Sequence, residues 1–410
     1  MDYTKQIIIS FVLITAAAFF AGPTTIIAQD DRSYELLPAP DLWFNSVDGI
    51  RVGGRVRGQM SGTFGDGPHR LDAGIWLGTK IPTHPVSYYI SLTEPIPSLS
   101  EFGSEANIRG RSSFRTGFQT HGLSFNKRWQ KGFDETNYTE LSLGMDAQRH
   151  FEESYLLYSQ LWQQEWLFPI SVNLLKTNDN RLGRYVFSIS ADANILGKYN
   201  NFSKAVITFK QRIPLTESVT LNSHLFTGLA TTNTAPEHLF SRSFKTGRKW
   251  MNSGWTRARG TIPPSWMQSG NIQVTGDANL RGYTHQDIDL LNERTAPLYT
   301  SFSAVNLELD YPNPLNKVIK TIPVAGEFIE LHSYLFFDTG TSLGLREEEQ
   351  NTLFSDAGPG FMFSINIPDY LGKNRGLMLR YDLPLWLSHP GDASSFKFRN
   401  VIGLGAVINL

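Results

Sequence analysis

The 410-residue sequence lacks cysteine altogether. This excludes a disulfide framework and every metal site built on thiolates. A charge excess of either sign is also missing, because 37 lysine and arginine residues are balanced by 38 aspartate and glutamate residues. The resulting net charge of −1 lacks the basic footprint of a nucleic-acid-binding surface, so we expect no nucleic-acid partner.

Apolar runs long enough for a membrane helix are missing from nearly the whole chain. The longest lies near the N-terminus, where Lys5 precedes an apolar run from Ile7 to Ala21, followed by small and turn-forming residues up to Ala28. This order predicts a cleaved secretory signal at residues 1–28. The alternative, an anchoring helix, is disfavoured because the run is shorter than the roughly 20 residues that a span needs.

What the chain has in place of such helices is alternation of apolar and polar residues. In residues 305–311 every second residue is apolar, and Asn306, Glu308 and Asp310 stand between them. The last fifteen residues, 396–410, alternate in the same way and are predicted as one long strand. Strands of soluble proteins average about five or six residues, whereas a tilted membrane strand needs about nine to eleven. The pattern therefore favours a membrane barrel over a soluble sandwich.

Strand-like runs recur along most of the chain. They lie near residues 42–60, 69–82, 85–97, 113–128, 136–149, 153–163, 166–178, 182–197, 201–215, 217–232, 298–311, 330–344, 354–367, 375–388 and 396–410. Single-chain bacterial barrels have an even number of strands, so we expect about 16. The predicted fold class is all-β, a transmembrane antiparallel β-barrel over residues 42–410. A short periplasmic segment is expected at residues 29–41.

The strand pattern is interrupted between about residues 234 and 297. A loop of this length without structure of its own is uncommon and tends to be functional or disordered. Tryptophan and proline residues such as Trp250, Trp255 and Pro263 favour an ordered segment. Near its end stands the tetrapeptide Leu280-Arg281-Gly282-Tyr283.

This tetrapeptide resembles a motif of the BamA/TamA outer-membrane assembly and translocation superfamily, the bacterial surface antigen-type barrels. There a Val/Leu-Arg-Gly-Phe/Tyr sequence lies at the tip of the sixth extracellular loop, which folds back into the barrel. Family partners of the motif are matched downstream and in family order, by Asn306-Leu307-Glu308, Phe336-Phe337-Asp338-Thr339-Gly340 and Gly358-Pro359-Gly360. The resemblance is anchored over residues 270–410, and only strand character extends it to residues 42–233.

The resemblance implies that residues 234–297 insert into the lumen and are held there by Arg281. A guanidinium offers a planar fork of donors that suits carboxylates, and alternation turns Glu308 toward the lumen. We therefore expect Arg281 to pair with Glu308, Asp338 or both. Glycine at position 282 allows a turn that a Cβ would block, and the partner glycines Gly340, Gly358 and Gly360 belong to the same set, the last two leaving room for the loop. The alternative is a solvated loop arginine and an ordinary turn acid.

The chain departs from the family before the barrel, where typical members carry substrate-binding POTRA domains. About fifteen residues separate Gln29 from Phe44, too few for a small domain of roughly 50 or more. A periplasmic partner, or direct capture at the barrel, is expected to substitute for such domains. Outer-membrane lipid and unfolded outer-membrane or secreted proteins are the other expected partners, in the outer membrane of a Gram-negative bacterium.

Three functions stay open on the sequence. The first is insertion, assembly or translocation of proteins or lipids at the outer membrane, through a seam between the first and last strands that can open. The second is a passive pore or lipid conduit plugged by the long loop, with Arg51, Arg55 and Arg57 facing the lumen. The third is a membrane hydrolase, since residues 340–344 spell Gly-x-Ser-x-Gly around Ser342. We expect no enzyme, no catalytic residue, no metal and no cofactor, because no zinc-protease motif is present and Ser342 is followed by acidic residues.

Overall fold

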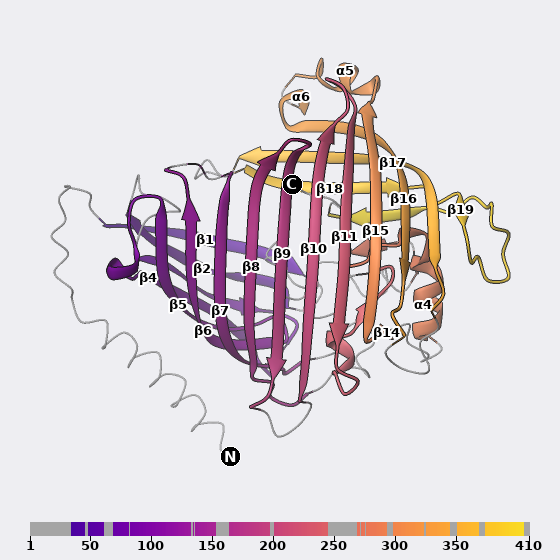
Figure 1. The fold of residues 1–410 in the computed structure, drawn as a ribbon. Coiled ribbons are helices and arrows are strands. Elements are labelled where there is room, and N and C mark those ends of the chain that lie inside the picture. The colour runs from indigo at the N-terminus through magenta and orange to yellow at the C-terminus, as the bar shows by residue number, and fades with distance from the viewer. Residues whose placement is uncertain are drawn as a thin grey trace.

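The computed structural model describes fifteen stretches of the chain: residues 34–45, 48–60, 69–81, 83–132, 134, 136–152, 164–196, 201–244, 269–270, 272–274, 276–292, 298–323, 325–344, 351–368 and 374–405. The signal sequence expected at residues 1–28, the strand expected at 153–163 and the tryptophans expected to order the long loop lie outside them. The protein folds as one large sheet that curves continuously from its first strands to its last (Figure 1).

Eleven strands follow one another from the N-terminus, each pairing antiparallel with the next. They are β1 Tyr34–Asn45, β2 Gly49–Met60, β3 Arg70–Gly78, β4 Val86–Pro95, β5 Ser104–Arg115, β6 Phe118–Gln130, β7 Tyr138–His150, β8 Pro169–Asn180, β9 Gly183–Asn194, β10 Phe202–Pro214 and β11 Thr220–Ala230. A short 3-10 helix, η2 Pro97–Leu99, lies between β4 and β5.

After the long loop, β15 Ser301–Pro312 pairs with β11 and restores the antiparallel order. It is followed by β16 Ile329–Thr341, β17 Phe354–Pro368, β18 Asn374–Asp382 and β20 Val401–Leu404, with β19 Trp386–Leu387 on the edge of β17. Sixteen strands thus pair in succession among the described residues, and the predicted antiparallel β-barrel fold is confirmed.

The two faces of the sheet are inverted relative to a soluble protein. Large apolar side chains stand exposed on its outside, including Leu36, Leu42, Phe44, Ile50, Val52, Ile75, Leu77 and Leu335. The inner face buries charge, and Arg51, Asp338, Arg380 and Asp382 are each at most 1% exposed. Soluble monomers rarely expose contiguous apolar surface of more than a few hundred Å². An apolar exterior around a polar interior is the arrangement of a transmembrane barrel.

The N-terminal boundary expected at residue 42 is wrong. Residues 34–45 form β1, which pairs with β2 along its whole length, and Gly49 with a φ of +73° starts β2 after the turn. The expected strand over 42–60 is therefore the end of one strand, a turn and a second strand. Pro38 and Pro40 obscured the first of these, since proline is tolerated in a strand mainly at an edge.

The C-terminal strand expected over residues 396–410 is shorter than predicted where the structure describes it. Residues 397–400 are irregular, and β20 begins only at Val401. Phe396 forms an isolated bridge with Trp386, and both Phe396 and Phe398 are largely exposed. Alternation alone could not separate this excursion from the strand that follows it.

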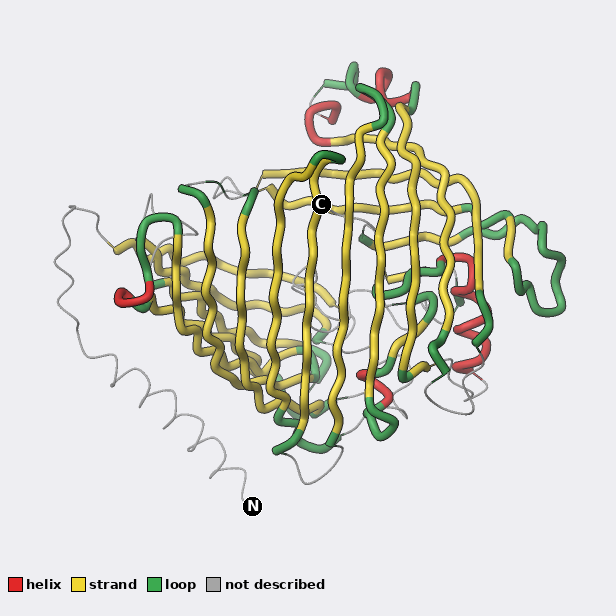
Figure 2. The backbone as a smooth tube through the Cα atoms, in the orientation of Figure 1, coloured by secondary structure: helices red, strands yellow, loops and turns green. Residues whose placement is uncertain are grey.

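The interruption after β11 contains structure of its own. Its described elements are η4 Pro236–His238, β12 Phe240–Ser241, β13 Ile272–Val274, η5 Arg281–Tyr283, α4 Thr284–Asn292 and β14 Leu298–Tyr299. Figure 2 shows α4 in red beside the strands of the C-terminal half. Two further helices, α5 Leu315–Ile319 and α6 Ala325–Phe328, lie between β15 and β16. None of the helices in the described residues is long and apolar enough to cross a membrane.

Candidate functional site

The tetrapeptide Leu280–Tyr283 lies inside the barrel wall rather than in solvent. Leu280, Arg281 and Tyr283 are 0% exposed, and the main-chain N–H of Leu280 donates to the carbonyl of Arg242 at 2.8 Å. Leu280 and Tyr283 belong to an apolar cluster that also includes Phe240, Phe302 and Leu387, from the loop, β15 and β19. The apolar residues of the motif thus pack the loop tip against the wall and leave Arg281 to face the acids.

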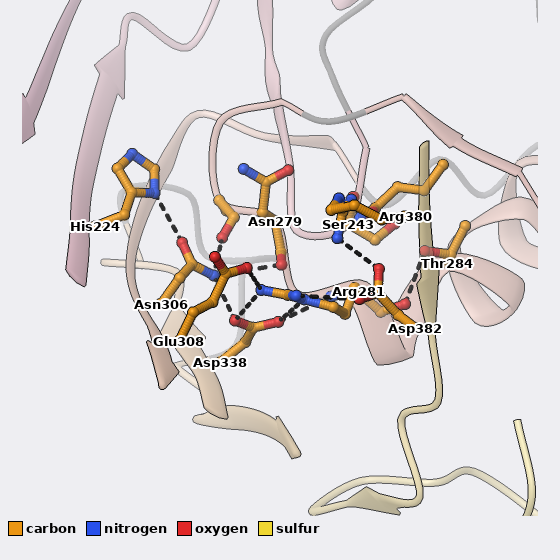
Figure 3. A network of polar contacts seen from close by, with 12 residues as sticks. His224, Ser243, Asn279, Arg281, Thr284, Asn306, Glu308, Asp338, Arg380 and Asp382 are labelled. Atoms are coloured by element: carbon orange, nitrogen blue, oxygen red, sulfur yellow. Dashed lines mark hydrogen bonds and ion pairs between the residues drawn. The ribbon is translucent and has the colours of Figure 1, made fainter. Parts of the chain in front are cut away.

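Arg281 contacts three carboxylates from three different strands (Figure 3). Its Nε donates to Oδ2 of Asp338 at 2.8 Å and its Nη2 to Oδ1 at 3.1 Å, which makes a bidentate pair with β16. Nη2 also donates to Glu308 of β15 at 2.9 Å, and Nη1 to Asp382 of β18 at 3.3 Å. The two acids predicted from the motifs are thus both in contact with Arg281, and a third joins them.

All the groups of this cluster, hereafter the loop lock (Arg281, Glu308, Asp338 and Asp382), are removed from water. Their side chains are 0% exposed except for that of Glu308, at 9%. A buried charge is tolerated only when it is paired and hydrogen-bonded, because desolvation costs several kcal/mol per ion. All three acids pair with Arg281, and the geometry specifies one position for the loop.

Asn306 ties the loop lock to the backbone of the inserted loop. It lies directly opposite Asp338 in the register of β15 and β16, and its amide donates to Asp338 at 2.9 Å. The same amide donates to the carbonyl of Ala278 at 3.0 Å, while its oxygen pairs with Nδ1 of His224 at 2.8 Å. The Asn-x-Glu motif thus supplies one residue to the loop backbone and one to Arg281.

The sequence motifs did not identify Asp382 and its two neighbours. Asp382 Oδ2 accepts a hydrogen bond from Arg380 at 2.5 Å, and Oδ1 accepts one from the hydroxyl of Tyr334 at 2.5 Å. Arg380 and Tyr334 are both about 1% exposed. A signal was present, since Arg380 and Asp382 alternate with Leu379 and Tyr381, but alternation shows only that they face the lumen.

Two of the predicted glycines, Gly282 and Gly340, lie where another residue packs too closely to leave room for a Cβ. A Cβ on Gly282 would lie 2.8 Å from Cβ of Asp356, the residue opposite Asp338 on β17. A Cβ on Gly340 would lie 2.8 Å from the Phe302 ring. Glycine at position 282 therefore permits a close approach to β17.

Gly358 and Gly360 do not make room for the loop, and that expectation is wrong. A Cβ on Gly358 would meet the carbonyl oxygen of Leu383 at 1.8 Å, where the chain leaves β18 and crosses toward β19. A Cβ on Gly360 would meet the Tyr334 ring at 2.3 Å. These glycines admit a neighbouring backbone and the aromatic ring that bonds Asp382. Their effect on the loop is indirect.

Tyr283 fastens the loop to the segment that follows β18. Its hydroxyl donates to the carbonyl of Ser355 at 3.1 Å, lies 3.1 Å from Oγ of Ser388, and accepts from the main-chain N–H of His389 at 3.2 Å. Phenylalanine would fill the same apolar place without these bonds. The tyrosine of the motif thus connects η5, β17 and the segment around His389.

A second buried ion pair stands beside the loop lock. Arg242 pairs with Asp287 of α4, whose other oxygen accepts from the hydroxyl of Ser243 at 2.5 Å. The Arg242 guanidinium also lies 4.8 Å from the Tyr283 ring centroid. Burial raises the pKa of Asp287, and Arg242 opposes this shift. Neither residue was singled out in the sequence, because both lie in the long interruption.

The Gly-x-Ser-x-Gly sequence does not form a strand-to-helix elbow in the described residues. Ser342 directly follows β16, and its Oγ accepts from the N–H of Gly344 at 3.1 Å. Residues 342–344 and 351–353 are irregular. Within the described stretches, no group of three or more histidine, aspartate or glutamate residues could hold a metal ion.

No protein-family model and no curated protein matches the chain. Among solved structures, it is similar to BamA from Haemophilus ducreyi lacking POTRA domains 1–3, at 13% identity and a TM-score of 0.45, over 93% of this chain and 74% of that one. It is also similar to CdiB from Escherichia coli, at 12% identity and a TM-score of 0.40, over 89% of this chain and 61% of that one. Likeness at this distance assigns no role to individual residues.

Proposed function

We propose that this chain is an outer-membrane barrel that inserts, assembles or translocates proteins, or lipids. A cleaved signal at residues 1–28 would deliver it to the periplasm of a Gram-negative cell. Its clients would be unfolded outer-membrane or secreted proteins, brought by a periplasmic partner or captured at the barrel itself.

The loop lock is the observation that carries this proposal. Arg281 joins a loop to three strands of the C-terminal half, and Asp382 stands on β18, the long strand nearest to the end of the sheet. A buried ion pair adds little net stability, yet removing one partner is costly. Such a network specifies a conformation more than it strengthens a fold. It suits a barrel whose loop must hold one position while its last strands engage a client.

The test is quantitative proteomics of the outer membrane and the secreted fraction after depletion of the protein. Cells complemented with wild type, Arg281→Ala or Arg111→Ala are compared. Arg111 is a matched control because it is also lumenal and pairs with one acid, Asp146, but lies on β5 away from the loop lock.

We expect depletion to remove a defined set of proteins, Arg281→Ala to reproduce that loss, and Arg111→Ala to restore the wild-type inventory. An unchanged inventory after depletion would refute protein assembly and favour a lipid conduit or pore. A loss restored equally by both variants would refute the role of the loop lock. The folded state of each variant is checked by its heat-modifiable migration in gels.

A further inference from the structure

The outer face of strands β2 to β7 changes from apolar to polar along the sheet. Two neighbouring rows of outward side chains cross these strands in register. The first row is Gly54, Ile75, Tyr88, Phe114, Gln119 and Arg149. The second row is Val56, Ala73, Ile90, Ser112 and His121. Ile75 is 60% exposed, as are other large apolar side chains of the membrane-facing wall, so both rows lie outside the lumen.

A hollow of about 1230 Å³ lies over these two rows, and all their residues except Arg149 contribute to its lining. Strands β1 to β4 supply apolar side chains and Trp166 lies at the polar end. No acidic side chain of the described residues lines the hollow. Binding pockets are typically apolar with a few polar groups at fixed places, and this hollow is large enough for a hydrocarbon chain.

An aromatic cluster marks the end of the hollow that lies near the turns. The rings of Phe114 and Phe151 stack with their centroids 4.1 Å apart, and the His84 ring lies within 5.6 Å of both. Aromatic side chains gather where the hydrocarbon core of a membrane meets water. Since successive strands are antiparallel, this is also the end at which the long loop leaves β11. The polar end of the hollow is therefore at the level of lipid headgroups.

Two hydrogen-bond donors at this end have no acceptor. Gln119 is only 8% exposed, and no described residue hydrogen-bonds to its side-chain amide. The indole N–H of Trp166 is buried and also has no hydrogen-bond partner among the described residues. An unpaired buried polar group is destabilising, and an indole can only donate. Both groups would be satisfied by a ligand that brings oxygen acceptors into the hollow.

The groups around these donors are held in place and include a cation. Oγ of Ser112 lies 2.8 Å from Nδ1 of His121 and 3.1 Å from the hydroxyl of Tyr88. Arg149 lies opposite Gln119 in the register of β6 and β7, and its guanidinium is 5.7 Å from the Trp166 ring centroid. A guanidinium suits a phosphate because its planar fork of donors matches two phosphate oxygens.

We propose that the outer face of β1 to β7 binds an acylated, phosphate-bearing lipid of the surrounding membrane. An acyl chain lies over the apolar strands β1 to β4, and the phosphate accepts hydrogen bonds from Gln119 and Trp166 beside Arg149. The site differs from general lipid contact because its donors are unpaired without the ligand. The proposal does not depend on the function proposed above, since it concerns a different face of the wall from the loop lock.

Binding is measured by native mass spectrometry of the purified protein in detergent. The protein is titrated with dioleoyl phosphatidic acid or with dioleoylglycerol, two probes that have the same acyl chains and differ in the phosphate. We expect the dissociation constant of phosphatidic acid to be about tenfold lower. Inorganic phosphate should not displace it, because inorganic phosphate lacks the chains. Equal binding of the two lipids, or displacement by inorganic phosphate, would overturn the proposal.

Three substitutions test the donors. Gln119→Leu, Trp166→Phe and Arg149→Gln should each weaken the binding of phosphatidic acid about fivefold to tenfold. Thr120→Val is the matched control, because Thr120 is the next residue on β6, faces the lumen, and has a buried hydroxyl with no partner among the described residues. Equal binding by Gln119→Leu and Thr120→Val would show that the lipid only coats the apolar exterior, and would overturn the proposal.

The stability of Gln119→Leu without lipid separates ligand binding from a role in the fold. Removing an unpaired buried amide should leave the unfolding temperature in detergent unchanged or raise it. Added phosphatidic acid should then raise the unfolding temperature of the wild type more than that of the variant. A lower unfolding temperature of the lipid-free variant would assign the amide to the fold and overturn the proposal.

Discussion

The two ends of the sheet treat lumenal charge differently. In strands β3 to β7 the lumenal charged residues pair across an intervening strand, as Arg111 does with Asp146 and Arg70 with Glu105, and these side chains stay between 15% and 41% exposed. The Arg51–Asp48 pair at the start of the sheet is the exception and is buried. At the C-terminal end Asp338 and Asp382 on the strands and Arg281 on the inserted loop are fully buried. The same alternation of residues therefore produces partly solvated pairs in β3 to β7 and a dry network where the loop covers the wall.

What separates the two ends is the loop rather than the strands. The described parts of the loop bond to the C-terminal strands through β13 on β20 and Arg281 on β15, β16 and β18. A pair exposed to water contributes little, whereas a stranded buried charge is costly. Charge substitutions should therefore matter far more at the C-terminal end.

The largest effect is expected from Arg281→Ala. It leaves the buried carboxylates of Glu308 and Asp338 without their cation and removes one of the two arginines that pair with Asp382, so it should lower the free energy of unfolding by about 3–5 kcal/mol or more. Arg111→Ala, at the solvated end, should cost at most about 1 kcal/mol. Both are measured by urea unfolding of the barrel in liposomes. Equal losses would show that the two ends do not differ in the way their burial indicates.

A smaller effect is expected from adding a methyl group at Gly360. The new Cβ would collide with the Tyr334 ring, which bonds Asp382, and overpacking of this kind typically costs about 1–3 kcal/mol. Gly110→Ala on β5 is the matched control, because its Cβ would lie 3.6 Å from Leu123, an ordinary contact. Thermal unfolding should separate the two variants, and a tolerated Gly360→Ala would show that Tyr334 can move without cost.

The smallest effect lies at the turn between β6 and β7, outside both lumenal regions. Asp134 is only partly buried, and hydrogen bonds from Thr136 and Asn137 lower its pKa from 3.8 to about 2. Because the folded pKa is depressed, the stabilisation of the turn is complete above about pH 4 and is lost as pH falls through about 2. The protection factor of the Thr136 amide, which is its exchange rate relative to that of an unstructured peptide at the same pH, should fall with this loss, and Asp134→Asn should abolish the change. A protection factor that is the same at pH 5 and pH 2 would contradict it.

The fold and part of the site were accessible from the sequence for physical reasons. Alternation of apolar and polar residues over runs longer than an ordinary soluble strand indicates membrane-spanning strands, so the barrel class was predicted correctly. Arg281, Glu308 and Asp338 stand in short motifs and could be named. Arg380 could not, because its role depends on strand register and on Gly403, which lets it reach a loop residue more than a hundred positions away.

The wrong predictions, of strand boundaries and of the role of Gly358, lie where the residue pattern does not reveal the path of the backbone. Pro38 and Pro40 hid β1, in which exposed and partly buried residues alternate from Tyr34 to Leu42 although the apolar and polar residue types do not. The excursion before β20 kept the alternation of a strand without its pairing. Gly358 was predicted to face the loop, but the close approach comes from the carbonyl of Leu383, which no sequence pattern marks.

The loop lock also orders the events of folding. Arg281 reaches Glu308 across 27 positions, Asp338 across 57 and Asp382 across 101. Contacts between distant segments form only after the entropy of closing the intervening chain has been overcome. The third contact therefore waits for β18, the last long strand among the described residues. The loop lock is therefore complete only when β18 has joined the sheet. A barrel truncated before β18 would hold Arg281 only through Glu308 and Asp338.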